Sequence, residues 1–345
     1  MTRKIRLKEV AADAGVSVAT VSRVLNGVDG VSPTLRERVM RYAAKLGVDL
    51  QRRNRSRIIA FLLCNRPVLH PFHSSVLVGA EAYCAANDYG LLFLPLQYAG
   101  TVPWKNLLIG QILQHREIIR GAIVAGTNTQ NLLDLLTGKG MPFVVLGNNV
   151  VGDWRKEAYS VVYFDDVEGA YEMTRYLLSL AHSHIWFVGN CRMPWHSRRC
   201  EGYRRAMAGA KLESLISEVD ADNSEDIGYL ATKTIFSKGE PITAIFAGDD
   251  ATARGAYKAI RDIGLRIPED VSVAGFNDTL EASALNPPLT TVRVFTDQLG
   301  KQMAELVVNR IARPDLGPQI LTLPTRLVKR ESCLPRPNID AVNVQ

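Results

Sequence analysis

Apolar runs of five to seven residues recur between residues 58 and 276, separated by longer stretches with helical periodicity. Continuous apolar runs of this length are typical of strands buried in a parallel sheet. The first series predicts strands at 58–64, 91–96, 122–126 and 143–147, with helices at about 75–89, 104–116 and 129–138. The second predicts strands at 160–164, 184–190, 244–248 and 271–276, with helices near 166–181, 198–210, 225–238 and 250–263. Two series of βα units predict two doubly wound subdomains.

This repeated pattern also places the ligand site. Ligands of doubly wound sheets bind beyond the carboxyl ends of the strands, so two such subdomains would hold a ligand in the cleft between them. A chain of 345 residues with 47% hydrophobic and 22% charged residues can bury the core of two or three domains.

A different pattern occupies the residues before 58. A first short helix carries apolar side chains spaced by three and four positions at Leu7, Val10, Ala11 and Ala14. Gly15 favours a sharp stop, and Ser17 is a suitable N-cap for a second helix that buries Val21, Val24 and Leu25. Ser32 and Pro33 begin a third helix that ends at Gly47. These residues predict a helix-turn-helix within a three-helix headpiece at about 5–47.

The second helix presents small, hydroxyl-bearing and basic side chains on its exposed face, which can enter a DNA major groove. The residues that we expect to contact DNA there are Ser17, Val18, Ala19, Thr20, Ser22, Arg23 and Asn26. Residues 1–57 hold thirteen Lys/Arg and five Asp/Glu, a net charge of +8, whereas the whole chain has a net charge of +6. A basic N-terminal segment followed by a nearly neutral remainder favours binding to the phosphate backbone of a nucleic acid. Spacing alone also fits a helical hairpin with a solvated face.

The segment KEVAADAGVSVATVSRVLNG resembles the N-terminal signature of the LacI/GalR family of bacterial transcription regulators, and PLTTVR and LPTRLVKRESC extend the resemblance. It implies an all-α helix-turn-helix headpiece followed by an α/β periplasmic-binding-protein-like core of two doubly wound parallel-sheet subdomains, between which the chain crosses three times. We expect a headpiece and linker at 1–57, a core at 58–335 and a polar tail at 336–345. Within the core, the first subdomain is expected at about 58–164 and 293–321, and the second at about 165–292 and 322–335.

The linker LGVDLQRRNRSRIIAF departs from that family. It lacks the usual tyrosine and proline and the leucine-bearing hinge helix, and it is shorter. It carries instead Arg52, Arg53, Arg55 and Arg57. An arginine-rich arm can lie in a narrow minor groove or along phosphates, so we expect Arg52, Arg53 and Arg55 to contact DNA. A solvated basic linker is the alternative.

The resemblance also implies an effector site. Arg199 in RRCEGYRRAM falls on the family's effector-holding arginine, although spacing alone would favour a surface arginine. Asp249 in AIFAGDDATARGAYKAI keeps the family carboxylate, which caps a helix or accepts ligand hydroxyls, and Gly248 replaces an asparagine. Asn277 in VSVAGFNDT replaces an aspartate. The expected effector-binding residues are Phe72, His73, Phe164, Arg199, Asp249 and Asn277.

Because several of these residues differ from the family pattern, the expected effector is a sugar or sugar derivative that the sequence does not identify. His182, His184, Cys191, His196 and Cys200 fit no zinc spacing, so no metal is expected. No Walker loop, GxSxG motif or paired carboxylates indicate catalysis, and we expect neither an enzyme nor a cofactor.

The sequence analysis therefore favours a homodimeric, ligand-controlled repressor of palindromic double-stranded DNA. Dimerisation is expected near 74–86, 251–262 and 279–286. Without an export signal or an apolar transmembrane stretch, and with five cysteines not in CxxC spacing, a cytoplasmic, nucleoid-associated protein without a membrane partner is expected. The alternatives are a cytoplasmic solute-binding sensor without specific DNA recognition and a sugar-modifying enzyme.

Overall fold

The computed structural model describes residues 2–25, 31–46, 57–107, 118–217, 219–221 and 223–336. The chain divides into two units, one of residues 1–58 with 111–120 and one of residues 59–110 with 121–345. The first contains the headpiece and the second the core, and each is described by itself.

The headpiece consists of three helices, α1 (Thr2–Asp13), α2 (Val18–Leu25) and α3 (Pro33–Lys45). The side chains of Val10, Val21, Val39 and Ala43 are fully buried where the helices meet. Gly15 lies between α1 and α2 with φ +64°, a conformation that glycine adopts without strain. The hydroxyl of Ser17 accepts the N–H of Thr20 at 3.0 Å. The helix-turn-helix is therefore present, although α1 begins several residues before the expected start of the headpiece.

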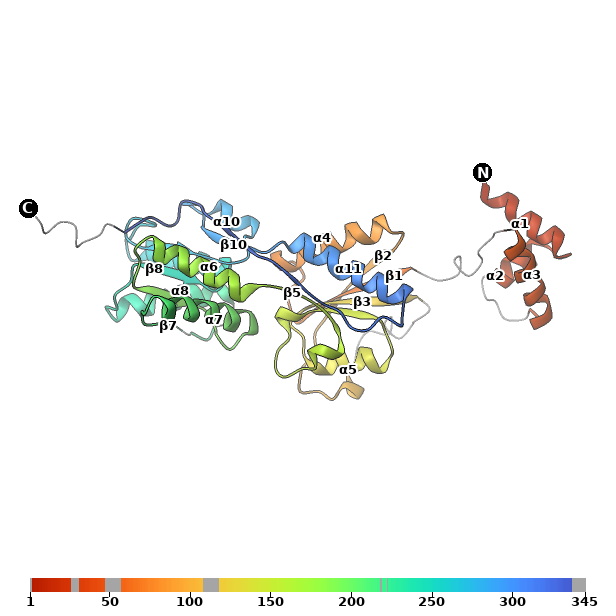
Figure 1. Ribbon diagram of the computed structural model, residues 1–345, viewed down its shortest axis with the longest axis horizontal. Helices are drawn as coiled ribbons and strands as arrows, with labels where there is room; N and C mark the ends of the chain where they lie inside the picture. The colour runs from red at the N-terminus through yellow and green to blue at the C-terminus, as the bar shows by residue number, and fades with distance from the viewer. Residues whose placement is uncertain are drawn as a thin grey trace, which may run out of the picture. The chain divides into compact units, whose positions relative to one another are not determined.

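The first lobe of the core is built on a six-stranded sheet in the order β11-β5-β4-β3-β1-β2 (Figure 1). The strands are β1 (Ile58–Cys64), β2 (Gly90–Leu96), β3 (Ile119–Gly126), β4 (Phe143–Leu146), β5 (Ser160–Phe164) and β11 (Ile320–Leu323). β3, β4, β5 and β11 pair in parallel. The helices of this lobe are α4 (Pro71–Ala86), α5 (Gln130–Gly138) and α11 (Thr296–Ala312), and α4 packs against α11.

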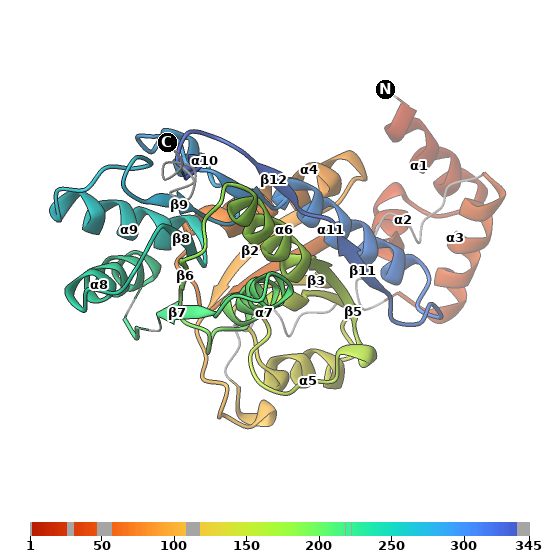
Figure 2. The same ribbon diagram turned by 60° about the vertical axis from the view of Figure 1, so that its left-hand side comes forward.

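The second lobe contains a four-stranded parallel sheet in the order β7-β6-β8-β9 (Figure 2). Its strands are β6 (Ile185–Val188), β7 (Leu215–Ser217), β8 (Ala244–Ala247) and β9 (Ser272–Ala274). Its helices are α6 (Asp166–Ser179), α7 (Pro194–Gly209), α8 (Ser224–Ser237), α9 (Asp250–Asp262) and the short α10 (Leu280–Ala284). α6 packs against α7, and α8 packs against α9. The two sheets confirm the predicted pair of doubly wound subdomains.

The chain crosses between the lobes three times, after β5, after β10 (Thr291–Arg293) and between β11 and β12 (Arg326–Val328). β10 and β12 pair antiparallel, with Thr291 opposite Val328. The predicted subdomain boundary at residue 321 falls within β11, which continues in the first sheet to Leu323. Three separate segments of the chain therefore link the two lobes.

Two helices begin earlier than their apolar periodicity indicates. α4 starts at Pro71 rather than near residue 75, and α7 starts at Pro194 rather than near residue 198. Both have proline in the first helical position, where the missing N–H costs no intrahelical hydrogen bond. The predicted helix at 104–116 is a 3₁₀ turn at Trp104–Asn106, and residues 108–117 lie outside the described part of the chain. In the portion of the chain that the structure describes, no helix is long and apolar enough to span a bilayer.

Candidate functional site

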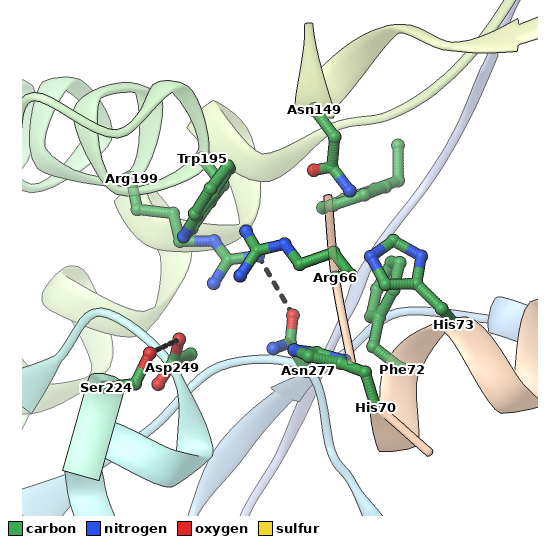
Figure 3. A pocket seen from close by; sticks show the side chains of 11 residues that line it. Arg66, His70, Phe72, His73, Asn149, Trp195, Arg199, Ser224, Asp249 and Asn277 are labelled. Atoms are coloured by element: carbon green, nitrogen blue, oxygen red, sulfur yellow. Dashed lines mark hydrogen bonds between the residues drawn. The ribbon is translucent and has the colours of Figure 1, made fainter. Parts of the chain in front are cut away.

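A pocket lies between the two lobes of the core and encloses about 380 Å³, including its open mouth (Figure 3). It is lined by Arg66, His70, Phe72, His73, Asn149, Phe164, Trp195, Arg199, Ser224, Asp249 and Asn277. The structure thus brings together all six residues that the sequence analysis assigned to the effector, from segments up to about two hundred residues apart in the chain.

Arg199 is held on the second lobe by the ends of two strands. Its side chain is 2% exposed, and its two terminal nitrogens donate to the carbonyl of Gly248 at 2.6 Å and to Oδ1 of Asn277 at 2.9 Å. Its guanidinium lies 4.0 Å from the ring centre of Phe276, and its Nε has no partner among the described residues. Burial lowers the pKa of Arg199 to about 10, although Asp166 and Asp249 act in the opposite direction. Arg199 is a buried cation whose hydrogen-bond acceptors are neutral.

Asn277 occupies a turn in which two successive residues have positive φ, +116° for Asn277 and +56° for Asp278. Asp278 holds this turn, because its carboxylate accepts hydrogen bonds from Arg293 at 2.5 Å and Arg330 at 2.6 Å. In this turn the side-chain oxygen of Asn277 accepts from Arg199, while the backbone N–H of Asn277 donates to the carbonyl of Val292 at 2.8 Å. Backbone strain at a pocket residue is a feature of functional sites.

Asp249 caps α9 and is saturated with hydrogen bonds. Oδ1 accepts the N–H and the hydroxyl of Thr252, both at 2.8 Å, and Oδ2 accepts the hydroxyl of Ser224 at 3.0 Å and Nε2 of His196 at 3.2 Å. Burial raises the pKa of Asp249, but the hydrogen bonds from His196 and Thr252 and the charge of Arg199 outweigh it and hold the pKa well below its usual range. The capping role is therefore present in the structure.

His196 occupies the space beside Gly248, the position where related sequences have an asparagine. A Cβ on Gly248 would lie 2.7 Å from Cδ2 of His196, so the imidazole fills the space that a larger residue at position 248 would need. Nδ1 of His196 accepts the N–H of Asn190 at 3.0 Å, so the neutral ring carries its proton on Nε2 and donates it to Asp249. Both ring nitrogens are used within the protein. In the residues that the structure describes, no three metal-ligating side chains gather.

The first lobe supplies an aromatic wall from the first turn of α4. The rings of Phe72 and Phe164 lie 5.7 Å apart, and His73 meets Phe72 edge-on at 5.2 Å. His73 is 2% exposed, and its Nδ1 has no partner among the described residues. Burial, and then the neighbouring His70 and Arg66, lower the pKa of His73 well below its usual range, so this imidazole is neutral at pH 7.

Sequence reasoning did not assign five of the lining residues. Trp195 lines the pocket from the first turn of α7, which begins at Pro194. In the same way α4 begins at Pro71, which places His70 directly before this helix. Ser224 begins α8 and binds Asp249. Arg66 and Asn149 follow β1 and β4 in turns whose direction no local pattern predicts. The five residues are therefore Arg66, His70, Asn149, Trp195 and Ser224.

The predicted DNA-contacting residues lie on and just before α2. Val18 is 42% exposed, Ala19 and Arg23 are exposed, and Thr20 and Ser22 are half-buried. The hydroxyls of Ser17 and Thr20 share a hydrogen bond of 2.8 Å. Asn26, Arg52, Arg53 and Arg55 lie outside the described residues.

Comparisons with known proteins agree with this architecture. Residues 6–47 match the family model "Bacterial regulatory proteins, lacI family", and residues 174–333 match a periplasmic binding protein-like domain. The chain is 30% identical to the ribose operon repressor of Haemophilus influenzae, covering 94% of this chain and 98% of that one. It is 31% identical to the HTH-type transcriptional repressor PurR of Vibrio cholerae, covering 94% and 97%. The solved complex of the transcriptional regulator CelR with cellobiose superposes with a TM-score of 0.70 at 29% identity, covering 94% and 99%.

The chain belongs to the LacI family of bacterial regulatory proteins. It is accordingly an effector-controlled, DNA-binding transcriptional regulator, with a helix-turn-helix headpiece and a core of the periplasmic-binding-protein type.

Proposed function

We propose that this regulator is a cytoplasmic, nucleoid-associated homodimer that represses transcription from a palindromic operator and senses a sugar or sugar derivative in the pocket between its lobes. It has no catalytic role in this proposal. The observation that carries it is the exposed face of α2, where Val18, Ala19 and Arg23 project from a helix supported by a fully buried core.

The chemistry of that face fits a major groove. Small side chains let a helix approach the base edges, and an arginine can donate to O6 and N7 of a guanine for about 1–3 kcal/mol of discrimination. The net charge of +8 on residues 1–57 supplies affinity for the phosphate backbone. Asn26 and the linker arginines Arg52, Arg53 and Arg55 complete the proposed contact surface.

A palindromic operator requires two headpieces, and the surface of the core supports a dimer. Val78 on α4 is 64% exposed and Leu280 on α10 is 88% exposed, and both lie in segments predicted for dimerisation. Leu69, just before α4, is 84% exposed. Exposed large apolar side chains on a surface favour a protein partner, and α4 of the first lobe and α10 of the second lie along the same side of the core in Figures 1 and 2.

The pocket has the composition of a carbohydrate site. Phe72, Phe164 and Trp195 supply flat apolar faces, and Arg199, Asn149 and Asn277 supply donors and acceptors. The relatives named for ribose and cellobiose support the same class of ligand. A ligand that bridges the two lobes changes their relative orientation and, through the dimer, the spacing of the two headpieces.

The test is a mobility-shift titration of the full chain with fragments from its own genome, at two salt concentrations. We expect a preferred palindromic fragment and binding that weakens steeply with salt. Arg23→Ala should reduce affinity for that fragment about tenfold or more while changing non-specific binding much less. Arg41→Ala removes the same charge from the exposed side of α3 and is the matched control.

Equal losses on specific and non-specific DNA would show that Arg23 contacts only phosphate. The absence of any preferred fragment would overturn the repressor proposal and leave the alternative of a solute-binding sensor without specific DNA recognition.

A further inference from the structure

The first lobe contributes to the pocket an arginine that forms no ion pair with the described residues. Arg66 follows β1, and its guanidinium lies over the ring of Trp195 from the second lobe, 4.2 Å from the ring centre. Its Nε is buried and has no hydrogen-bond partner among the described residues. In Figure 3 the guanidinium groups of Arg66 and Arg199 extend from opposite walls toward one another beside Trp195. The pocket therefore holds two cations with free donor capacity.

The nearest carboxylate cannot satisfy those donors. A carboxylate offers about four lone-pair sites, and Asp249 already accepts four hydrogen bonds, from Thr252 twice, from Ser224 and from His196. Its charge attracts Arg66 and Arg199 at longer range without a direct hydrogen bond.

The other carboxylates around the pocket are paired elsewhere. Asp166 accepts two hydrogen bonds from Arg198, at 2.9 and 3.0 Å. Asp278 is bound by Arg293 and Arg330. Glu281 accepts from Arg254 at 2.7 Å. Among the side chains that line the pocket, two arginines thus face one aspartate whose oxygens are occupied.

Two imidazoles complete the same wall. The rings of His70 and His73 lie 5.0 Å apart, and Nδ1 of each is buried without a partner among the described residues. A neutral imidazole can donate or accept one hydrogen bond at each nitrogen. Buried polar atoms without partners are rare in folded proteins, and four residues with such atoms around one pocket indicate a ligand that supplies their partners, with acceptors for the two arginine Nε groups.

From this arrangement we infer that the effector carries an anionic group, a carboxylate or a phosphate, which binds between Arg66 and Arg199. The effector class is then a sugar acid or a sugar phosphate rather than a neutral sugar. This inference rests on the proposed sensing function of the pocket. Guanidinium groups bind planar carboxylate and phosphate oxygens with paired hydrogen bonds, and the low exposure of Arg199 strengthens such contacts.

Arg66 is then the residue that determines specificity. Arg199 also has neutral acceptors in Gly248 and Asn277, so it can bind the sugar ring of a neutral or of a charged ligand. Arg66 has no such acceptors, and an anionic group is the partner that its free donors fit.

The test measures the affinity of the full chain for matched ligands by isothermal titration calorimetry. The panel contains glucose, glucuronate and glucose 6-phosphate, the corresponding galactose series, and ribose with ribose 5-phosphate. Inorganic phosphate and acetate report on the anion alone and distinguish a phosphate from a carboxylate preference. We expect a charged member to bind at least about tenfold more tightly than its neutral counterpart.

Arg66→Gln should reduce that preference to about threefold or less. Arg313→Gln, which removes the same charge from an exposed site after α11, should leave the preference unchanged. Neutral members that bind as tightly as charged ones, or a preference that survives Arg66→Gln, would overturn the inference and leave the sugar-sensing proposal in place. Failure of every charged ligand to bind would overturn the inference as well, and the DNA titration above, which needs no ligand, separates that result from failure of the regulator proposal.

Discussion

The two walls of the pocket are built in opposite ways. On the second lobe, Arg199, Asp249 and Asn277 are tied to backbone and side-chain partners in the absence of a ligand. On the first lobe, Arg66, His70 and His73 carry buried nitrogens without partners. The second-lobe side chains are thus held mainly by protein partners, with Nε of Arg199 the exception, whereas these first-lobe nitrogens have no partner among the described residues. A ligand that bridges them therefore gains most of its new hydrogen bonds from the first lobe, which favours closure of the pocket.

The largest expected effect on stability comes from a substitution on the second-lobe wall of the pocket. Asp249→Ala removes the N-cap of α9 and leaves the buried donors of Thr252, Ser224 and His196 without an acceptor, so it should lower the free energy of unfolding by about 3 kcal/mol. Arg66→Gln on the other wall loses little more than its stacking on Trp195 and should cost less than about 1 kcal/mol. Urea unfolding followed by circular dichroism measures both. Similar costs on the two walls would contradict this comparison.

A smaller effect concerns how the free energy of unfolding depends on pH through Asp250, next to the second-lobe wall. Burial raises the pKa of Asp250, the neighbour of Asp249 in the first turn of α9, to about 7. The folded state then holds a proton that the unfolded chain releases above about pH 4, so this contribution to stability is complete at low pH and is lost as pH rises through 7. Between pH 5 and 8 the loss should be about 2 kcal/mol relative to Asp250→Asn, which does not titrate. The single amide oxygen of the asparagine can accept from Thr279, and its NH2 group can donate to the hydroxyl of Thr291.

Unfolding free energies of the wild type and Asp250→Asn, measured in parallel across that range, isolate the contribution from other titrating groups. Parallel pH profiles for the two proteins would show that Asp250 is ionised throughout. A difference of the opposite sign would place its pKa below that of the unfolded chain.

The parts of the molecule differ in how well their structure could be predicted from the sequence. The headpiece was predictable because its signals are local: a glycine after α1, a serine before α2 and apolar residues at helical spacing. Most strands of both sheets were predictable from continuous apolar runs, but β7 and β11 were not among the predicted strands. Arg199, Asp249 and Asn277 on the second wall were predicted only through the resemblance to the LacI/GalR family, since spacing alone favoured a surface arginine at position 199.

The lining residues that the sequence analysis missed, which come from both lobes, were harder to predict because they depend on where helices begin and how turns leave the strands. Periodicity placed the starts of α4 and α7 four residues too late, whereas Pro71 and Pro194 mark the actual first turns. That error concealed Trp195, the partner of Arg66. Arg66 lies in a turn after β1, and nothing in the adjacent sequence indicates that its side chain reaches the opposite lobe.

The central claim is that occupancy of this pocket controls DNA binding by the headpiece. It is tested most directly by measuring the dissociation constant of the full chain for its preferred genomic fragment, with and without a saturating charged sugar identified in the calorimetric panel. We predict a change of about 5- to 150-fold in the wild type that is much reduced in Arg66→Gln at the same ligand concentration. An operator affinity that stays the same when the pocket is saturated would contradict the claim.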